Sequence, residues 1–443
     1  MTKQRKLNFG LLKQTIIDND LCTRCGLCKG ICPTGVISLN KRGYPFLSGD
    51  CVQCGVCVRS CPGGDVNFPM MSQMVFGQDY DPDSLHGYVE NMFVCHASDE
   101  TIRANGTSGG LVTALLIYML KKNIIDGAVV ITMDSNNPCQ TTGILATTPE
   151  EIIASSQSKY CITPSMEVLS QIRKKKGTFA VVGLPCQVHG LRKLQHSDPA
   201  LASKIGYIFG LYCACNMEPY GHVEAMKACK IEPDEVEKFM FRGGDWPGGY
   251  YVERKDGRKG RIHPISNSSI LHVMFRLYGA TRCHSCVDAL SEYADLSFGD
   301  FWAFDYEGAL AELERCTLVS QRSKRGLDIL KQAKADNAIV SYDLDKDRKS
   351  KRIVSLVWKK KDRAYIRIKR NIKKGKSVPR YHFEFPEPRA QGKLSDLLYS
   401  MFYLFRGVNG RKLLLKLLFS PFGMVCDKLN IFRRKMFAGY HGN

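Results

Sequence analysis

The sequence predicts an α+β unit at the N-terminus, a larger α/β unit after it, and a basic, mostly helical C-terminal segment. Three observations lead to this fold class. A cysteine pattern occurs twice near the N-terminus, apolar segments of strand and helix length alternate over residues 105–215, and the excess positive charge is confined to the C-terminal segment. A chain of 443 residues is long enough for several domains. We expect them at residues 12–69, 90–345 and 346–443.

The repeated cysteine pattern lies in LCTRCGLCKGICPTG (21–35) and DCVQCGVCVRSCPGG (50–64). Each reads C-x2-C-x2-C-x3-C-P, and in paired runs of this kind the fourth cysteine ligates the other 4Fe-4S cluster. Zinc usually takes two separated pairs of ligands, and disulfide scaffolds suit small secreted chains. The predicted ligands are Cys22, Cys25, Cys28 and Cys61 for one cluster, and Cys51, Cys54, Cys57 and Cys32 for the other. Residues 12–69 therefore resemble bacterial-type two-cluster ferredoxin domains.

The number of cysteines and the distribution of charge indicate the cellular location of the protein and its kinds of partner. Nineteen cysteines without an apolar secretion signal predict a reducing, cytoplasmic location where thiols ligate iron. No apolar run reaches the length of about 18 residues that a spanning helix needs. Residues 1–345 hold 37 basic and 37 acidic residues, whereas residues 346–443 hold 26 basic and 6 acidic ones. This asymmetry indicates that the C-terminal segment has its own partner.

The middle of the chain alternates strands and helices. NGTSGGLVTALLIYMLKK (105–122) predicts a helix, and IDGAVVITM (125–133) predicts a buried strand. TFAVVGLPCQVHGLRKL (178–194) predicts a strand, a tight turn and a helix, and KIGYIFGLYCAC (204–215) predicts a strand that ends in cysteines. Cofactors of α/β proteins bind at such strand ends.

The start of the first helix is a candidate cofactor contact. Ser108, Gly109 and Gly110 offer backbone amides and the positive end of a helix dipole to a phosphate or to another polar part of a cofactor. An ordinary N-cap at Thr107 or Ser108 with close packing explains the same residues equally well.

Two other stretches supply further candidate contacts. Gly183 and Pro185 lie in the tight turn between strand and helix. The segment FRGGDWPGGYYVERKDG (241–257) could close over a cofactor ring, although a β-hairpin with glycine-rich turns is favoured. Its candidate contacts are Arg242, Trp246 and Tyr250.

Four more cysteines stand at turns and strand ends. They are Cys186 in GLPCQ, Cys213 in GLYCACN, and Cys283 and Cys286 in RCHSCVDALSEYADLSFGDFW. If the sheet gathers these loops, they form a four-thiolate site; otherwise each is a small buried apolar residue. The acidic residues of the last block are favoured as capping or ligand-supporting groups over proton donors; they are Asp288, Glu292, Asp295 and Asp300. The sequence assigns no catalytic residue.

Four ordered blocks carry a family resemblance. TSGGLVTALLIYML, GLPCQVHGLRKL, GLYCACN and the RCHSC block together resemble the coenzyme F420 hydrogenase/dehydrogenase beta-subunit family over residues 90–345. The resemblance implies an FAD-binding α/β domain that holds a third 4Fe-4S cluster and exchanges hydride with a deazaflavin or a related substrate. Matched block by block, its ligands are Cys186, Cys213, Cys283 and Cys286. The additional Cys215 leaves the choice between Cys213 and Cys215 open.

The resemblance and the paired cluster motif imply an iron–sulfur flavoprotein oxidoreductase. It would pass electrons between coenzyme F420, or a related hydride carrier, and a one-electron redox partner protein, with FAD converting two-electron into one-electron transfer. Two alternatives stay open: a ferredoxin-dependent FAD reductase of an organic substrate in a host without coenzyme F420, and an electron carrier without flavin. Nucleic-acid binding is disfavoured because the chain shows no recognised binding module.

The C-terminal segment predicts amphipathic helices. A basic run (346–380) is followed by two apolar stretches, LSDLLYSMFYLF (394–405) and RKLLLKLLFSPFGMV (411–425), and across the segment basic residues stand beside apolar ones at roughly helical spacing. Such helices lie on an anionic membrane surface, here at the inner face, or pack on the α/β unit with their charges in water. The sequence leaves both alternatives open.

Overall fold

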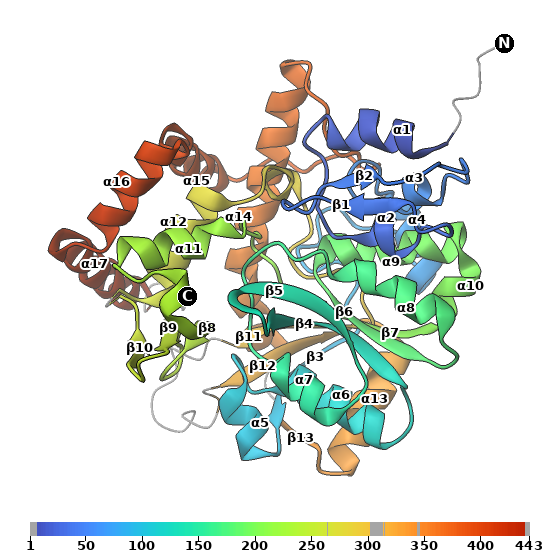
Figure 1. Ribbon diagram of the computed structural model, residues 1–443, viewed down its shortest axis with the longest axis horizontal. Helices are drawn as coiled ribbons and strands as arrows, with labels where there is room; N and C mark the ends of the chain where they lie inside the picture. Colours follow the sequence, from blue (N-terminus) through green and yellow to red (C-terminus); the bar gives the residue numbers. More distant parts are fainter. Residues whose placement is uncertain (1–6, 264, 302–312, 314, 343–345, 439–443) are drawn as a thin grey trace.

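The computed structural model describes residues 7–263, 265–301, 313, 315–342 and 346–438 (Figure 1). It combines a ferredoxin-like N-terminal region, an eight-stranded mixed sheet with helices on both faces, a three-stranded sheet and a series of C-terminal helices. The predicted mixed α/β class with a ferredoxin-like unit at the N-terminus is therefore confirmed.

Each cysteine run of the N-terminal region folds as a loop followed by a short helix. The helices α2 and α3 begin directly after Gly26 and Gly55, which adopt left-handed conformations with φ of 81° and 74°. A side chain at either position would be strained, which explains the matching glycines of the two runs. The elements are α1 (Phe9–Leu12), a π-helical turn (Lys13–Ile17), α2 (Leu27–Gly30), β1 (Ile37–Leu39), β2 (Pro45–Leu47), α3 (Val56–Ser60) and α4 (Phe68–Phe76).

The large sheet has the strand order β13-β3-β12-β11-β7-β6-β4-β5. Its central strands β11, β7, β6 and β4 run parallel, and the outer strands pair antiparallel. The bounds are β3 (Asn91–Ala97), β4 (Gly127–Asp134), β5 (Asn137–Ala146), β6 (Phe179–Gly183), β7 (Ile205–Leu211), β11 (Leu296–Phe301), β12 (Cys316–Gln321) and β13 (Ile339–Tyr342). The expected strands 125–133 and 178–183 are thus β4 and β6.

Both faces of the sheet are covered, so the central strands are apolar on both sides. Val129 and Val181 are buried on the face of α8 (Leu169–Lys174) and α9 (Pro185–Ser197). Their neighbours Ala128 and Ala180 are buried on the opposite face, because successive residues of a strand alternate between faces. That face carries α6 (Leu111–Lys121), α7 (Pro149–Ala154) and α13 (Lys324–Ala335), with α5 (Glu100–Asn105) at its edge (Figure 1).

A smaller sheet and two helices form a separate core beside the large sheet. The order β10-β9-β8 is antiparallel throughout, and β8 and β9 form the hairpin favoured from the sequence. The elements are α11 (Tyr220–Ala228), β8 (Val236–Gly243), β9 (Gly249–Arg254), β10 (Lys259–Arg261) and α12 (Asn267–Tyr278), whereas the short α10 (Pro199–Ala202) belongs to the core of α8 and α9.

The C-terminal helices pack on the rest of the molecule. Ala364, Tyr365 and Ile368 of α14 are buried in the same core as α8 and α9. The helices are α14 (Lys346–Lys373), α15 (Ala390–Met401), α16 (Val408–Leu418) and α17 (Pro421–Ala438). Among helices in the described ranges, none combines the length and the apolar character needed to cross a membrane.

Candidate functional site

The eight cysteines of the ferredoxin-like region lie in two adjoining groups. Burial raises the pKa of Cys22 to about 12, and the neighbouring Cys61 adds to the rise. Burial likewise raises the pKa of Cys57 to about 12, with Cys32 among the neighbours that contribute. Cys61 is therefore a neighbour of the first run and Cys32 a neighbour of the second, an arrangement that is compatible with the predicted crossed pairing.

These thiols fit iron–sulfur clusters better than single ions. Across the described ranges, no three His, Cys, Asp or Glu side chains gather closely enough to hold one metal ion. A four-iron cluster stands between its thiolates, so its ligands lie farther apart, and four cysteines are its usual donor set. Burial alone opposes thiolate formation, and the positive charge of bound iron would offset it.

A third group of thiols lies between the ferredoxin-like region and the large sheet. Cys186 is at the start of α9 and Cys213 follows β7, whereas Cys283 lies in a short 3-10 helix (Thr281–Ser285) and Cys286 follows it, before β11. Burial raises the pKa of Cys186, and further rises come from Cys25, Cys286, Cys283 and Cys213. The structure thus brings the four predicted cysteines together and places Cys25 of the first run beside them.

Cys215 is a fifth thiol at the edge of this group. A hydrogen bond between Cys215 and Cys283 lowers the pKa of Cys283 and raises that of Cys215. Cys213 interacts with Cys283 and Cys286, and it also acts on Cys186. The geometry therefore favours Cys213 as the fourth member, with Cys215 as a hydrogen-bonding neighbour.

A lysine of α14 ties the loops of this group together. Lys360 Nζ donates hydrogen bonds to the backbone oxygens of Cys213 and Asp288, both at 2.6 Å. Burial opposes the charge of this ammonium, but Cys286, Cys213 and Asp288 outweigh burial and raise the pKa of Lys360. The sequence analysis missed Lys360 because it stands in a basic run where every lysine has the same surroundings.

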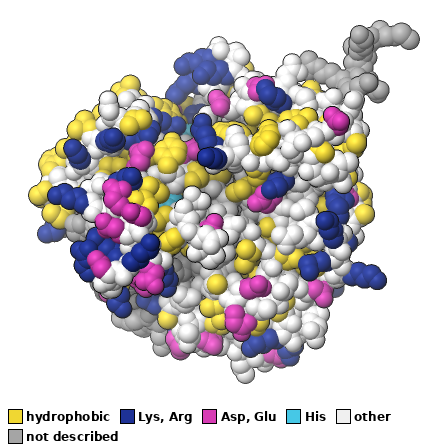
Figure 2. All heavy atoms as spheres, in the orientation of Figure 1, with side chains coloured by type: hydrophobic (Ala, Val, Ile, Leu, Met, Phe, Trp, Pro, Cys, Tyr) yellow, Lys and Arg dark blue, Asp and Glu magenta, His cyan; other side chains and the backbone are white. Residues whose placement is uncertain are grey.

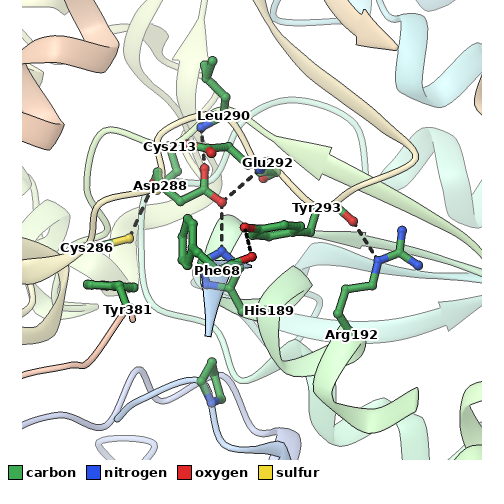
Figure 3. Close-up of polar contacts among 12 residues, drawn as sticks. Phe68, His189, Arg192, Cys213, Cys286, Asp288, Leu290, Glu292, Tyr293 and Tyr381 are labelled. Atoms are coloured by element: carbon green, nitrogen blue, oxygen red, sulfur yellow. Dashed lines mark hydrogen bonds and ion pairs between the residues drawn. The ribbon is translucent and has the colours of Figure 1, made fainter. Parts of the chain in front are cut away.

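The acidic residues of the RCHSC block are mostly structural. Asp288 accepts hydrogen bonds from His189 Nε2 at 2.9 Å and from the backbone amides of Leu290 and Glu292 (Figure 3). Burial opposes its charge, but the contact with His189 lowers the pKa of Asp288 to about 2. Asp288 thus has the capping geometry favoured from the sequence.

Glu292 and Asp295 are buried beside cations. A Glu292 carboxylate oxygen lies 3.0 Å from Lys361 Nζ, and Asp295 accepts from Arg325 Nε at 2.7 Å. Neither residue contributes to the wall of the cavity described next. These positions fit charge compensation and leave Asp300 as the acidic residue that faces a possible ligand.

A cavity of about 430 Å³ opens at the carboxyl ends of β4, β6 and β7. Ser108, Gly110 and Gly183 line it, so three of the predicted cofactor contacts meet there. Cys213 and Cys215 are also part of its wall. The cavity and the third thiol group therefore share residues, and a bound cofactor would lie directly against that group.

The loop before α6 differs in detail from the prediction. The expected N-cap at Thr107 or Ser108 is wrong, because α6 begins at Leu111 after Gly110. Gly109 and Gly110 have φ of 87° and 66°, and a Cβ on Gly109 would stand 2.4 Å from a backbone oxygen. Two consecutive left-handed residues delay the helix. Thr107 instead accepts a hydrogen bond from the backbone of residue 158 at 2.9 Å.

The other predicted contacts lie farther from the cavity. Arg242 forms an ion pair of 2.6 Å with Asp300, whose side chain belongs to the wall. Arg242 is thus placed one residue behind the surface of the cavity. Pro185 and Trp246 are not part of the wall, and Tyr250 is buried in the core of the smaller sheet.

Lys159 is a wall residue that the sequence analysis did not single out. Its Nζ donates to the backbone oxygens of Ser155 at 2.6 Å, Ser156 at 2.5 Å and Gln157 at 3.3 Å. Burial lowers the pKa of Lys159 to about 7. The three hydrogen bonds fix the loop that closes one side of the cavity, and no motif marks a lysine with this role.

The ferredoxin-like region is fixed against the large sheet by its cysteine loops. Arg24, beside Cys25, pairs with Glu218 at 2.5 Å, and only 2% of its side chain is exposed. The backbone amide of Met166 donates to the oxygen of Cys25 at 3.0 Å. On the other run, Lys193 Nζ of α9 donates to the oxygen of Cys61 at 2.6 Å. The first cluster loop is therefore held next to the third thiol group.

Comparisons with known proteins agree with this arrangement. Residues 92–170 and 177–347 match the N-terminal and C-terminal family models of the coenzyme F420 hydrogenase/dehydrogenase beta subunit. Residues 18–65 match a 4Fe-4S dicluster domain. Together, the two beta-subunit models cover more than half of the chain.

Two relatives and one solved structure are similar to the chain. It is 26% identical over 64% of its length to a coenzyme F420-dependent sulfite reductase of Methanocaldococcus jannaschii, and it spans only 43% of that protein. It is 27% identical over 66% of its length to one of the proteins that make up the F420H2 dehydrogenase of Methanosarcina mazei, and it covers 78% of that relative.

The solved structure is a chain of the F420-reducing NiFe hydrogenase complex of Methanosarcina barkeri. It shares 22% identity with a TM-score of 0.55, and the match covers 67% of this protein and 98% of that chain. This likeness supports the fold. The two beta-subunit models decide membership: the protein belongs to the coenzyme F420 hydrogenase/dehydrogenase beta-subunit family of oxidoreductases and carries a 4Fe-4S dicluster domain at its N-terminal side.

Proposed function

We propose that the protein is an FAD-dependent iron–sulfur oxidoreductase that passes electrons between coenzyme F420, or a related hydride carrier, and a one-electron carrier such as ferredoxin. One observation carries the proposal: Cys213 belongs both to the wall of the cavity and to the third thiol group. A cofactor in the cavity would therefore contact the site of a cluster. Both relatives named above are F420-linked by name, which supports the choice of hydride carrier.

The position and the size of the cavity support the proposal of a bound flavin. The cavity lies at the carboxyl ends of parallel strands, where α/β proteins bind cofactors, and its volume is in the usual range for ligand sites. Gly110 in a left-handed conformation and Ser108 bring backbone close to the cavity. A bound flavin would supply the exchange between two-electron and one-electron transfer.

Residues of this chain would position the flavin and shield its electron exchange from solvent. Lys159 holds the closing loop through three backbone oxygens, and the ion pair with Arg242 orients Asp300 at the wall. Lys360 places a buried positive charge beside the third thiol group, where it stabilises thiolates. We propose that Cys186, Cys213, Cys283 and Cys286 hold the third 4Fe-4S cluster.

The order of the three thiol groups defines the electron route. The third group adjoins Cys25, and the first run adjoins the second through Cys57. Cys54 of the second run is exposed, as is Val52, of which 60% is accessible. The redox partner protein would therefore dock at the second run. In this proposal residues 12–69 and 90–345 carry the cofactors, and residues 346–443 support them through Lys360.

Anaerobic purification followed by cofactor analysis tests the proposal. We expect FAD and about twelve irons per chain, and bleaching of flavin and cluster absorbance when reduced coenzyme F420 is added. If reduced coenzyme F420 has no effect but reduced ferredoxin reduces the flavin, the protein is a ferredoxin-dependent reductase. About eight irons without flavin would identify an electron carrier and overturn the proposal.

A further inference from the structure

The helix α15 turns a charged residue toward the protein and most of its apolar residues toward the solvent. Its polar side faces the protein, where Asp396 accepts hydrogen bonds from Arg367 Nε at 2.6 Å and from Arg370 at 2.8 Å. Its apolar side faces outward, and 61% of Leu397 is exposed. The exposed apolar residues of this helix are Leu394, Leu397, Leu398 and Met401. A helix packed for burial alone would show the opposite arrangement.

The helix α17 has the same arrangement, with a buried acidic residue and exposed apolar residues. Asp427 is buried and accepts hydrogen bonds from the backbone amide and the hydroxyl of Ser266, at 2.8 and 2.7 Å. Phe422, Val425 and Leu429 are exposed, with 67% of Phe422 accessible. Polar contacts thus fasten both helices to the protein and leave their apolar sides without cover.

The exposed apolar residues concentrate on these helices. Of the twenty large hydrophobic side chains exposed in the described part of the chain, eleven lie between residues 394 and 429. They include Leu404, which is 84% exposed, and Leu413 and Leu417 of α16. Single exposed hydrophobic residues are normal, but a collection of this size marks a binding surface. We call these residues of α15–α17 the C-terminal apolar surface.

We propose that the C-terminal apolar surface docks on an anionic lipid bilayer. The only acidic residues between 390 and 443 are Asp396 and Asp427, and both are buried. Exposed lysines stand among the apolar residues: Lys393, Lys412, Lys416 and Lys428. In Figure 2 hydrophobic and basic side chains lie side by side along the left edge, where Figure 1 shows α16 and α17. Apolar residues beside lysines, without exposed acids, are the composition of helices that lie in an anionic interface.

A bilayer explains this surface better than a protein partner does. Lysine is depleted from the cores of protein interfaces, because its desolvated ammonium needs a counter-charge. At a bilayer, the lysine stems lie along the acyl chains and the ammonium groups reach the phosphates of the headgroups. Leu404 and Phe422 would insert between the lipids, while α16 lies flat.

The position of the surface is compatible with electron transfer at the other end. In Figure 1 α16 and α17 lie on the opposite side of the molecule from α1, α2 and α3. Docking would leave the exposed Cys54 accessible to a partner protein in solution. The inference goes beyond the proposed function and does not depend on it.

Vesicle co-sedimentation of the full chain tests the proposal. We expect binding to vesicles of phosphatidylcholine with phosphatidylglycerol, weaker binding without phosphatidylglycerol, and release by salt. A triple variant, Leu397→Ser, Leu404→Ser and Phe422→Ser, should bind at least about tenfold more weakly, since three exposed side chains lose their burial in lipid. Lys412→Gln with Lys416→Gln should weaken binding about fivefold per lysine and flatten the salt dependence.

The matched control removes exposed apolar side chains elsewhere on the molecule. Met70→Ser, Ile153→Ser and Ile372→Ser together should bind vesicles as the unchanged protein does, because these positions lie outside the surface. Protein that stays in the supernatant overturns the proposal, and so does a triple variant that binds normally. A dimer that dissociates in the triple variant, without lipid binding, would identify a protein interface instead. Iron and FAD contents of the same samples report separately on the proposed function.

Discussion

The two cysteine regions of this protein are built in different ways. The N-terminal eight cysteines lie within about 40 consecutive residues, and glycines in left-handed conformations shape both of their loops. The third group collects Cys186, Cys213, Cys283 and Cys286 from three separate loops, and Lys360 from a helix still farther along the chain joins two of them. The first region is encoded locally, whereas the third group exists only when the large sheet and α14 are in place.

The largest difference between the regions is expected for Lys360→Met. Two buried carbonyls lose their donor and the thiols lose their cation, while methionine keeps the volume. Removing one partner of a buried charged contact costs about 3–5 kcal/mol. We expect the iron content to fall from about twelve to about eight per chain, with the ferredoxin-type signals intact.

The neighbouring lysine supplies the control for this experiment. Lys359 Nζ lies 5.3 Å from the ring of Trp358 and is less buried than Lys360. Lys359→Met should therefore keep all of the iron and most of the stability. Iron analysis with electron paramagnetic resonance checks both variants. Full iron content in Lys360→Met would show that the third group does not need the ammonium of Lys360.

The choice between Cys213 and Cys215 gives the next largest effect. Cys213→Ser should remove about four irons, because Cys213 interacts with three of the other members of the group. Cys215→Ser should retain the iron and alter only the environment of Cys283, to which Cys215 is hydrogen bonded. Iron content and the visible spectrum distinguish the variants, and the reverse pattern would assign Cys215 as the ligand.

The contact between the two regions can be perturbed by a single methyl group. A Cβ on Gly30 of α2 would stand 2.1 Å from the backbone oxygen of Met166, so Gly30→Ala must push the ferredoxin-like region away. Overpacking of this kind costs about 1–3 kcal/mol. We expect slower reduction of the N-terminal clusters by electrons that enter at the cavity, in a stopped-flow measurement. Gly407→Ala is the control, because its Cβ would meet open space. Equal rates in both variants would argue against a fixed route.

The sequence predicted what is local and missed what the fold assembles. Doubled spacing identified eight thiols without any tertiary knowledge, and the ends of β6 and β7 were placed because apolar runs give strands. The family resemblance, rather than spacing, linked Cys186 with Cys283. The role of Lys360 and the N-cap at Gly110 were missed, since both depend on how distant segments pack. The exposure of the apolar side of α15 could not be predicted either, because the same helical spacing of apolar residues occurs in helices with a buried and with an exposed apolar side.

The smallest expected effect compares two ion pairs across the contact between the regions. Arg24 and Glu218 are almost buried at 2.5 Å, whereas Lys29 and Glu167, at 2.6 Å, are partly exposed. Glu218→Gln keeps hydrogen-bond acceptors but leaves the buried guanidinium without its counter-charge, which should cost about 1–2 kcal/mol. Glu167→Gln should cost less than about 1 kcal/mol because solvent screens the more accessible pair.

The stability of both variants is measured under anaerobic conditions as the temperature at which the cluster absorbance is lost. We expect the N-terminal clusters of Glu218→Gln to be lost at a lower temperature than those of Glu167→Gln, while the third group follows the unchanged protein. Salt should reduce the small effect of the exposed pair and leave that of the buried pair nearly constant, since buried charges are screened less. If both variants behave alike, the pair of Arg24 and Glu218 does not hold the two regions together, and backbone contacts such as that of Cys25 with Met166 must do so.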